Sequence, residues 1–264
     1  MVERGRMDYN DYRPHSSLDD ATSAALAGLC QQAGCLRSYP PLLNGVHDGG
    51  FTMTERNTPT ECDVSSDAAW PRMTREQVNA HPILKYPGRI HVIRRSEQIE
   101  PAIRQLEKEK LLGFDTETRP TFRVGQSYLP AVLQLAGEQA AYIFQLRHCR
   151  LSQALCRLLA NPKIIKAGVA WDRDVQELHK LASFTPAGFV DVGELARQTG
   201  CTHHGLRGLA TLLLGFRVSK KSQTSNWAQA TLTRAQIEYA ATDAWVGREL
   251  YQKLQRLLPA STTQ

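Results

Sequence analysis

The stretch Leu111-Leu112-Gly113-Phe114-Asp115-Thr116-Glu117-Thr118 decides the fold that we expect for this chain. Apolar residues lead into it, as in a buried strand, and two carboxylates follow two positions apart. Because side chains alternate between the two faces of a strand, Asp115 and Glu117 point to the same face. Like charges near a core are unfavourable unless a cation neutralises them, and hard divalent ions prefer oxygen ligands. The pair therefore predicts half of a metal site, with a strand end that runs into an acidic loop as the alternative.

Two later stretches carry acids that would complete such a site. A strand is expected to end at Val169, and Asp172 and Asp174 then fall in the first turn of a helix, where the helix dipole favours carboxylates. Plain helix capping is the alternative for both. Further on, Tyr239 and Asp243 lie four residues apart, on one face of a helix whose neighbouring alanines leave room for a cation and a phosphate. A tyrosine ring in the core with an aspartate at its rim is the alternative here.

Length and composition are those of a soluble globular protein. The chain has 264 residues, 42% hydrophobic and 22% charged, which is enough for one large domain or two small ones. No apolar run is long enough to span a membrane, and the N-terminus lacks the apolar region of a signal peptide. We therefore expect a cytoplasmic protein without a membrane partner.

The net charge of +6 is unevenly distributed along the chain. Residues 1–72 carry 6 basic and 10 acidic residues, whereas residues 73–264 carry 26 basic and 16 acidic residues. A basic domain attracts polyanions, of which nucleic acid is the commonest. Charge that serves only solubility is the alternative.

Residues 1–72 are expected to form a mostly disordered or low-order extension, because polar, glycine and proline residues dominate there without sustained periodicity. Residues 8–18 resemble the C-terminal end of insertion-sequence transposases, although they carry no catalytic acid of that family. Our hypothesis is that this segment comes from a reading frame fused upstream, or that the native chain starts at Met53 or Met73.

Residues 73–264 show regular patterns that predict one α/β domain. Strands are expected at residues 89–95, 111–118, 132–136, 140–146, 164–169 and 189–192. Helices are expected at residues 96–110, 151–160, 171–181, 193–198, 205–214 and 233–257. Strands that alternate with helices, followed by a helical C-terminal half, indicate a mixed sheet packed between helices.

The three acidic stretches, in this order, resemble the exonuclease motifs of the DnaQ-like DEDDy 3′–5′ exonucleases. The matching residues are Asp115-x-Glu117, then Gly168-Val169 followed by Asp174, then Tyr239-x-x-x-Asp243. The runs 205–215 and 221–227 look like that family too, and the resemblance extends from about residue 90 to residue 258. The Gly-Val form of the second motif is more similar to the Werner-syndrome exonuclease domain than to RNase D.

This resemblance implies a ribonuclease-H-like fold, that is, an α/β domain with a mixed five- or six-stranded sheet flanked by helices. It also implies a metal-dependent exonuclease that hydrolyses phosphodiester bonds at the 3′ end of DNA or RNA and releases nucleoside 5′-monophosphates. Two Mg²⁺ or Mn²⁺ ions would be held by Asp115, Glu117, Asp174 and Asp243. Tyr239 would orient the attacking water, because a phenol with a pKa of about 10 is too weak a base to deprotonate it.

Contacts to the nucleic acid are expected from residues around the motifs. Phosphate contacts are expected from Arg217, Lys220 and Lys221, with a solvated charge cluster as the alternative. Contacts to the terminal nucleotide are expected from Phe114, Thr116 and Leu135, with a place in the core as the alternative for the apolar ones.

Two further features are interpreted as structural. Trp227 is expected in the core, and the pair His203-His204 is expected in a loop, because no partner at metal-ligand spacing accompanies it. Three function classes stay open at this point: an active exonuclease, a nuclease-fold binding protein without activity, and a transposase. A 3′ ladder from a labelled oligonucleotide separates the first two, and strand transfer of specific DNA ends is the mark of the third.

Overall fold

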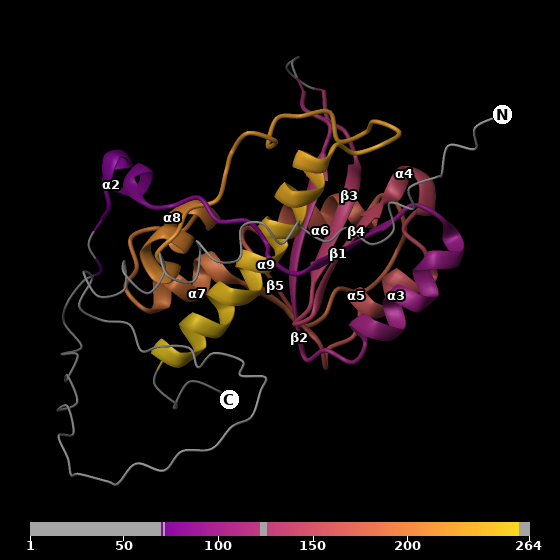
Figure 1. The fold of residues 1–264 in the computed structure, drawn as a ribbon. Coiled ribbons are helices and arrows are strands. Elements are labelled where there is room, and N and C mark those ends of the chain that lie inside the picture. Colours follow the sequence, from indigo (N-terminus) through magenta and orange to yellow (C-terminus); the bar gives the residue numbers. More distant parts are fainter. Residues whose placement is uncertain (1–69, 71, 122–125, 259–264) are drawn as a thin grey trace, which may run out of the picture. The chain divides into compact units, whose positions relative to one another are not determined.

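The computed structural model describes residue 70, residues 72–121 and residues 126–258 (Figure 1). The expectations for residues 1–69, which include the low-order extension, the segment 8–18 and the alternative start at Met53, lie outside the described residues.

Six strands form one mixed sheet in the order β1-β4-β3-β2-β5-β6. Their bounds are β1 (Arg89–Ile93), β2 (Leu111–Thr118), β3 (Pro130–Ala136), β4 (Ala140–Gln145), β5 (Ile165–Gly168) and β6 (Phe189–Asp191). Strand β3 pairs antiparallel with β2 and β4, whereas the pairs β1–β4, β2–β5 and β5–β6 are parallel. The predicted mixed sheet is confirmed, and it has six strands.

Most helices lie where they were expected, and the differences are named below. Their bounds are α2 (Arg75–Ala80), the 3₁₀ helix η2 (Ser96–Gln98), α3 (Ile99–Leu106), α4 (Leu146–Cys149), α5 (Gln153–Leu159), α6 (Trp171–His179), α7 (Val192–Gln198), α8 (Leu206–Leu209), the π-helical turn η3 (Ala210–Leu214) and α9 (Arg234–Leu257). Helices α2 and α4 were not expected, and the helix expected from residue 96 begins as a 3₁₀ turn. None of the described helices is long and apolar enough to cross a membrane.

Helical layers cover both faces of the sheet (Figure 1). On one face, α3, α5 and α6 pack on a core that includes Leu112 and Phe114 of β2. On the other face, α9 packs on Val132 and Ala136 of β3. Helices α7 and α8 bury their apolar residues against the C-terminal part of α9. The strand that carries the first acidic motif therefore lies between two helical layers.

Helix α9 lies very close to β2 where the acidic motif begins. A Cβ atom at Gly113 would stand 1.7 Å from the carbonyl oxygen of Ala244, so only glycine fits there unless the helix moves. On the helix side, Ala240, Ala241 and Ala244 are fully buried. Small residues on both elements permit this close approach, which places the acids of β2 beside the helix that carries Asp243.

Candidate active site

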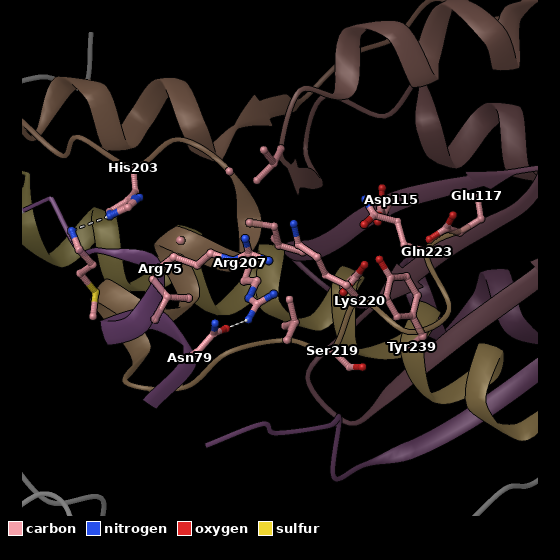
Figure 2. A pocket seen from close by; sticks show the side chains of 18 of the residues that line it. Arg75, Asn79, Asp115, Glu117, His203, Arg207, Ser219, Lys220, Gln223 and Tyr239 are labelled. Atoms are coloured by element: carbon pink, nitrogen blue, oxygen red, sulfur yellow. Dashed lines mark hydrogen bonds between the residues drawn. The ribbon is translucent and has the colours of Figure 1, made fainter. Parts of the chain in front are cut away.

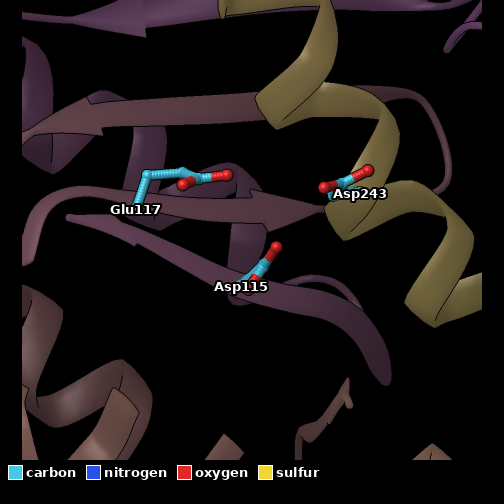
Figure 3. Close-up of side chains that lie close together, drawn as sticks. All are labelled: Asp115, Glu117 and Asp243. Atoms are coloured by element: carbon cyan, nitrogen blue, oxygen red, sulfur yellow. The ribbon is translucent and has the colours of Figure 1, made fainter. Parts of the chain in front are cut away.

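Three carboxylates from two distant parts of the chain converge at this approach. Asp115 and Glu117 come from β2 and Asp243 from α9, and Figure 3 shows the three side chains directed toward one another. One carboxylate oxygen from each lies within 4.8 Å of the others. Alternation along β2 places the first two on one face, as expected, and a register shift in the β2–β3 pairing occurs between Glu117 and Thr118. The cluster is compatible with a divalent metal.

The fourth predicted acid, Asp174, lies near this cluster but is not part of it. It stands in the first turn of α6, and its Oδ1 accepts a hydrogen bond of 2.6 Å from the hydroxyl of Thr116. Burial raises the pKa of Asp174, while the Thr116 hydroxyl and the charge of Arg173 act in the opposite direction. Asp172 is exposed and is not part of the cluster. The structure thus places Asp174, and not Asp172, beside the first motif.

Burial and mutual repulsion make the charged forms of the clustered acids unfavourable. Burial raises the pKa of Asp115 well above its ordinary value, and the charges of Asp243 and Asp174 raise it further. Burial, followed by the charges of the other acids, raises the pKa of Glu117 to about 10. Burial also raises the pKa of Asp243 to about 7, although hydrogen bonding with Tyr239 counteracts the rise. Bound cations would relieve this repulsion.

Buried polar atoms without partners lie around the cluster. Gln134 is directly opposite Asp115 in the β2–β3 pairing and is fully buried. Within the described part of the chain, neither side-chain polar atom of Gln134 has a hydrogen-bond partner, and neither has Oδ1 of Asp243. Such atoms cost free energy unless a water or an ion satisfies them. They fit a site that takes up further polar ligands.

Tyr239 stands one helical turn before Asp243 and lines the same pocket. Burial raises the pKa of its phenol, and the negative charge of Asp243 raises it further. On its other side the ring packs against Trp227, with the ring centroids 5.9 Å apart. Trp227 is 1% exposed, so its expected place in the core is confirmed. The phenol is therefore held in place and stays protonated near neutral pH.

A pocket of about 800 Å³ contains the cluster and extends well beyond it (Figure 2). Phe114, Thr116 and Lys220, three of the predicted nucleic-acid contacts, line this pocket. Residues that were not predicted to contact nucleic acid also line it: Arg75, Asn79, His203, Arg207, Ser219 and Gln223. The pocket thus joins an acidic end to a wall with several basic and amide side chains.

Three other predicted nucleic-acid contacts do not line the pocket. Leu135 is fully buried in the core, so it has no surface for contact with a base. Arg217 donates from Nε to the backbone oxygen of His81 at 2.9 Å, and Lys221 is exposed beyond the pocket wall. Leu135 is buried because it lies in β3, between two other strands, on the face covered by α3, α5 and α6.

The two histidines serve the loop structure, as expected. Nε2 of His203 accepts a hydrogen bond of 3.0 Å from the backbone N–H of Met73, and Nε2 of His204 lies 3.1 Å from the backbone oxygen of Cys201. No histidine belongs to a metal-ligand group among the residues that the structure describes.

The six-stranded fold and its carboxylate cluster are those of a ribonuclease-H-like domain of the DnaQ-like class. The chain belongs to the 3′–5′ exonuclease family, whose model matches residues 90–259. A mouse (Mus musculus) protein named bifunctional 3′-5′ exonuclease/ATP-dependent helicase WRN is 32% identical over 186 residues, which cover 67% of this chain and 13% of that protein. The chain spans 13%, 26% and 40% of the length of the first three curated relatives that it matches. The predicted family is confirmed.

Solved structures with the same fold include an EXO domain and an exoribonuclease. The EXO domain of Aedes aegypti Nibbler has a TM-score of 0.59 at 21% identity. The alignment covers 72% of this chain and 93% of the Nibbler chain. Escherichia coli RNase D, described as an exoribonuclease involved in structured RNA processing, has a TM-score of 0.59 at 20% identity and covers 64% of this chain and 44% of that chain. Both likenesses establish the fold.

Proposed function

We propose that residues 73–264 form a divalent-metal-dependent 3′–5′ exonuclease that acts on the 3′ end of DNA or RNA. The observation that carries this proposal is the convergence of Asp115, Glu117 and Asp243, with carboxylate oxygens within 4.8 Å of one another. None of these three acids forms an ion pair with a basic residue in the described part of the chain. Burial and mutual repulsion therefore make their charged forms unfavourable unless cations balance the charge. Membership of the 3′–5′ exonuclease family supports the same activity.

The four acids fit two hard divalent ions, Mg²⁺ or Mn²⁺, because every candidate ligand is a carboxylate oxygen. Asp115, Glu117 and Asp243 would hold one ion. Asp115 would share a second ion with Asp174, which lies on the other side of β2. When bound, such ions supply positive charge that makes water a better nucleophile near neutral pH and stabilises the departing oxygen.

In the proposed reaction, a water oxygen attacks the phosphorus of the last phosphodiester bond. The bond between phosphorus and the 3′ oxygen of the penultimate nucleotide breaks, the attacking water releases a proton to solvent, and the departing oxygen takes one up, so that a nucleoside 5′-monophosphate leaves and a new 3′ hydroxyl remains. Tyr239 positions the water through its hydroxyl, since a phenol with a raised pKa keeps its proton and cannot serve as the base. Phe114 and Thr116 line the pocket where the terminal nucleotide would lie, and Lys220 offers a charge to a phosphate.

A degradation assay tests the proposal. Oligonucleotides labelled at the 5′ end, as matched DNA and RNA in single-stranded and 3′-recessed forms, are incubated with Mg²⁺ or Mn²⁺. We expect a ladder that shortens from the 3′ end, release of 5′-monophosphates, and complete loss of both in EDTA. Full activity in EDTA, or internal cuts without a ladder, would contradict the proposal. The four substrates compared side by side also give the preference between DNA and RNA.

A further inference from the structure

The wall of the pocket away from the carboxylates is basic. In Figure 2, Arg75, Asn79 and Arg207 gather at one end, while Asp115, Glu117 and Tyr239 lie at the other. Arg75 and Asn79 come from α2, and Arg207 comes from α8. The basic end is therefore assembled from two segments that are more than a hundred residues apart in the sequence.

Specific hydrogen bonds hold these two segments together. Nη2 of Arg207 donates to Oδ1 of Asn79 at 2.6 Å. On one side of this bond, the backbone N–H of Met73 donates to His203 at 3.0 Å. On the other side, the backbone N–H of Arg217 donates to the oxygen of Pro82 at 2.9 Å. Helix α2 buries none of its own residues, so these polar contacts fix its position beside α8.

Within the described residues, the positive charge at this end is not neutralised by an ion pair. Among the described residues, no carboxylate forms an ion pair with Arg75 or Arg207. Burial lowers the pKa of Arg207, and the neighbouring charges of Arg217 and Arg75 lower it further. In addition, Nε of Arg207 is buried and makes no hydrogen bond within the described part of the chain. The guanidinium groups of Arg75 and Arg207 thus lie in one wall of the pocket, and among the described residues no carboxylate is paired with either.

We propose that Arg207 and Arg75 form a second phosphate site, which binds a phosphate upstream of the bond that is cleaved. The inference rests on the proposed exonuclease function and assigns to it a substrate requirement. Guanidinium groups suit phosphates because they present several donors in a plane. An anion bound here would also balance the repulsion between the guanidinium groups of Arg75 and Arg207. Asn79 is a positioning residue, since its amide oxygen orients the guanidinium of Arg207.

The order of groups along a nucleic-acid strand identifies which phosphate this site takes. On the 3′ side of the cleaved bond lies a terminal nucleoside with a free hydroxyl, whereas every further phosphate lies on the 5′ side. A basic site in the same pocket as the carboxylates, yet at its other end, therefore meets the strand upstream. The enzyme should consequently favour oligonucleotides that are long enough to reach Arg207 over the shortest ones.

The test uses single-stranded substrates with a 3′ hydroxyl and lengths of about two to eight nucleotides. For the longer substrates, we expect Arg207→Ala to raise KM about tenfold with little change in kcat, because a hydrogen bond to a charged group is lost. For substrates too short to reach the site, KM should equal that of the wild type. The slope of log Kd against log salt should become shallower by about 0.7 for each lost phosphate contact on a single strand.

Three variants separate phosphate binding from a structural role. Arg207→Lys keeps the charge and should recover most of the affinity, whereas Asn79→Ala should raise KM less and leave the salt slope unchanged. Arg104→Ala removes an exposed charge of α3, outside the pocket, and should behave as the wild type. A KM for Arg207→Ala that equals the wild-type value at every length would overturn the proposal. A rise in KM that occurs only with substrates carrying a 3′-terminal phosphate would overturn it too.

Binding measurements keep this test independent of catalysis. Fluorescence anisotropy with a labelled single strand in EDTA reports the affinity of the protein for the strand without metal ions and without cleavage. If the wild type degrades no substrate, the exonuclease proposal fails, yet weaker binding and a shallower salt slope for Arg207→Ala would still support the phosphate site. If the wild type is active and Arg207→Ala binds equally well, only the phosphate site is refuted.

Discussion

The hydroxyl of Thr116 donates a hydrogen bond of 2.6 Å to Oδ1 of Asp174, which links β2 to α6. Thr116 stands between Asp115 and Glu117, and alternation along the strand turns it to the opposite face of the sheet. Three consecutive residues of β2 therefore engage acids from both helical layers: α9 on one face and α6 on the other. Through this bond, the position of Asp174 depends on a residue that is not itself a metal ligand in our proposal.

Removing the Thr116 hydroxyl should weaken the site without removing an acid. Because hydrogen bonds to charged groups are worth about 1.5–3 kcal/mol, we expect Thr116→Val to lower the degradation rate about tenfold or more at limiting metal. Thr116→Ser keeps the donor and should stay close to the wild type. The measurement is the rate as a function of Mn²⁺ concentration, and a wild-type metal dependence for the valine variant would refute the role of this bond.

Replacing one clustered acid should abolish activity and stabilise the metal-free protein. Asp243→Asn removes one of the repelling charges at nearly constant volume, so activity should fall at least about a hundredfold, more than for residues that only support a metal ligand. In EDTA at pH 8, Tm should rise by a few degrees, since about 1 kcal/mol corresponds to roughly 2–4 °C in a domain of this size. Asp172→Asn, at an exposed position, is the matched control and should change neither quantity.

The stability of the metal-free protein should decrease as the pH rises. Burial raises the pKa of Asp243 to about 7 and that of Glu117 to about 10, so the folded state binds these protons more tightly than the unfolded state. Their favourable contribution is complete below pH of about 4 and is lost as the pH rises through the folded-state pKa values. For Asp243 the loss amounts to a few kcal/mol at most, on the order of 1.4 kcal/mol per pH unit.

Urea unfolding at pH 5, 6, 7 and 8 measures this effect. In EDTA, the free energy of unfolding should fall across the series, and Mg²⁺ or Mn²⁺ should restore it increasingly toward pH 8, because the ions bind the charged carboxylates. A stability that rises with pH in EDTA, or that does not respond to metal at pH 8, would contradict the electrostatics of the cluster.

Loss of the Tyr239 hydroxyl should affect catalysis and leave substrate binding intact. The phenol lies next to Asp243 and is backed by Trp227, so phenylalanine should keep the packing of the ring. We expect Tyr239→Phe to reduce kcat by about 10- to 100-fold, because the hydroxyl that positions the attacking water is lost, with the Kd for a single strand unchanged. Equal losses in binding and in turnover would instead indicate a structural role.

The acids could be located from the sequence because their spacing obeys the periods of strand and helix. Asp115 and Glu117 share a face through the two-residue period, and Tyr239 and Asp243 share one through the four-residue spacing. Spacing alone left Asp172 and Asp174 equivalent. In the structure they differ, because Asp172 is exposed whereas Asp174 is partly buried and accepts a hydrogen bond from Thr116.

The basic end of the pocket could not be located in the same way. Helix α2 buries no residue, so no apolar periodicity marks it, and Asn79 meets Arg207 across 128 positions of the chain. For Leu135 the sequence pattern allowed two positions, because an apolar residue beside the acidic strand suits a base contact as well as a core position. The order of strands in the sheet, which local patterns do not fix, decides that it is buried.

The central claim is that the carboxylates of Asp115, Glu117 and Asp243 hold divalent cations. It is tested most directly by an anomalous difference map from a crystal soaked in Mn²⁺, collected on protein that degrades a labelled oligonucleotide in the same buffer. We predict a peak between these three side chains, and a second one between Asp115 and Asp174. A map without a peak at the cluster, from protein that is active under those conditions, would contradict the account.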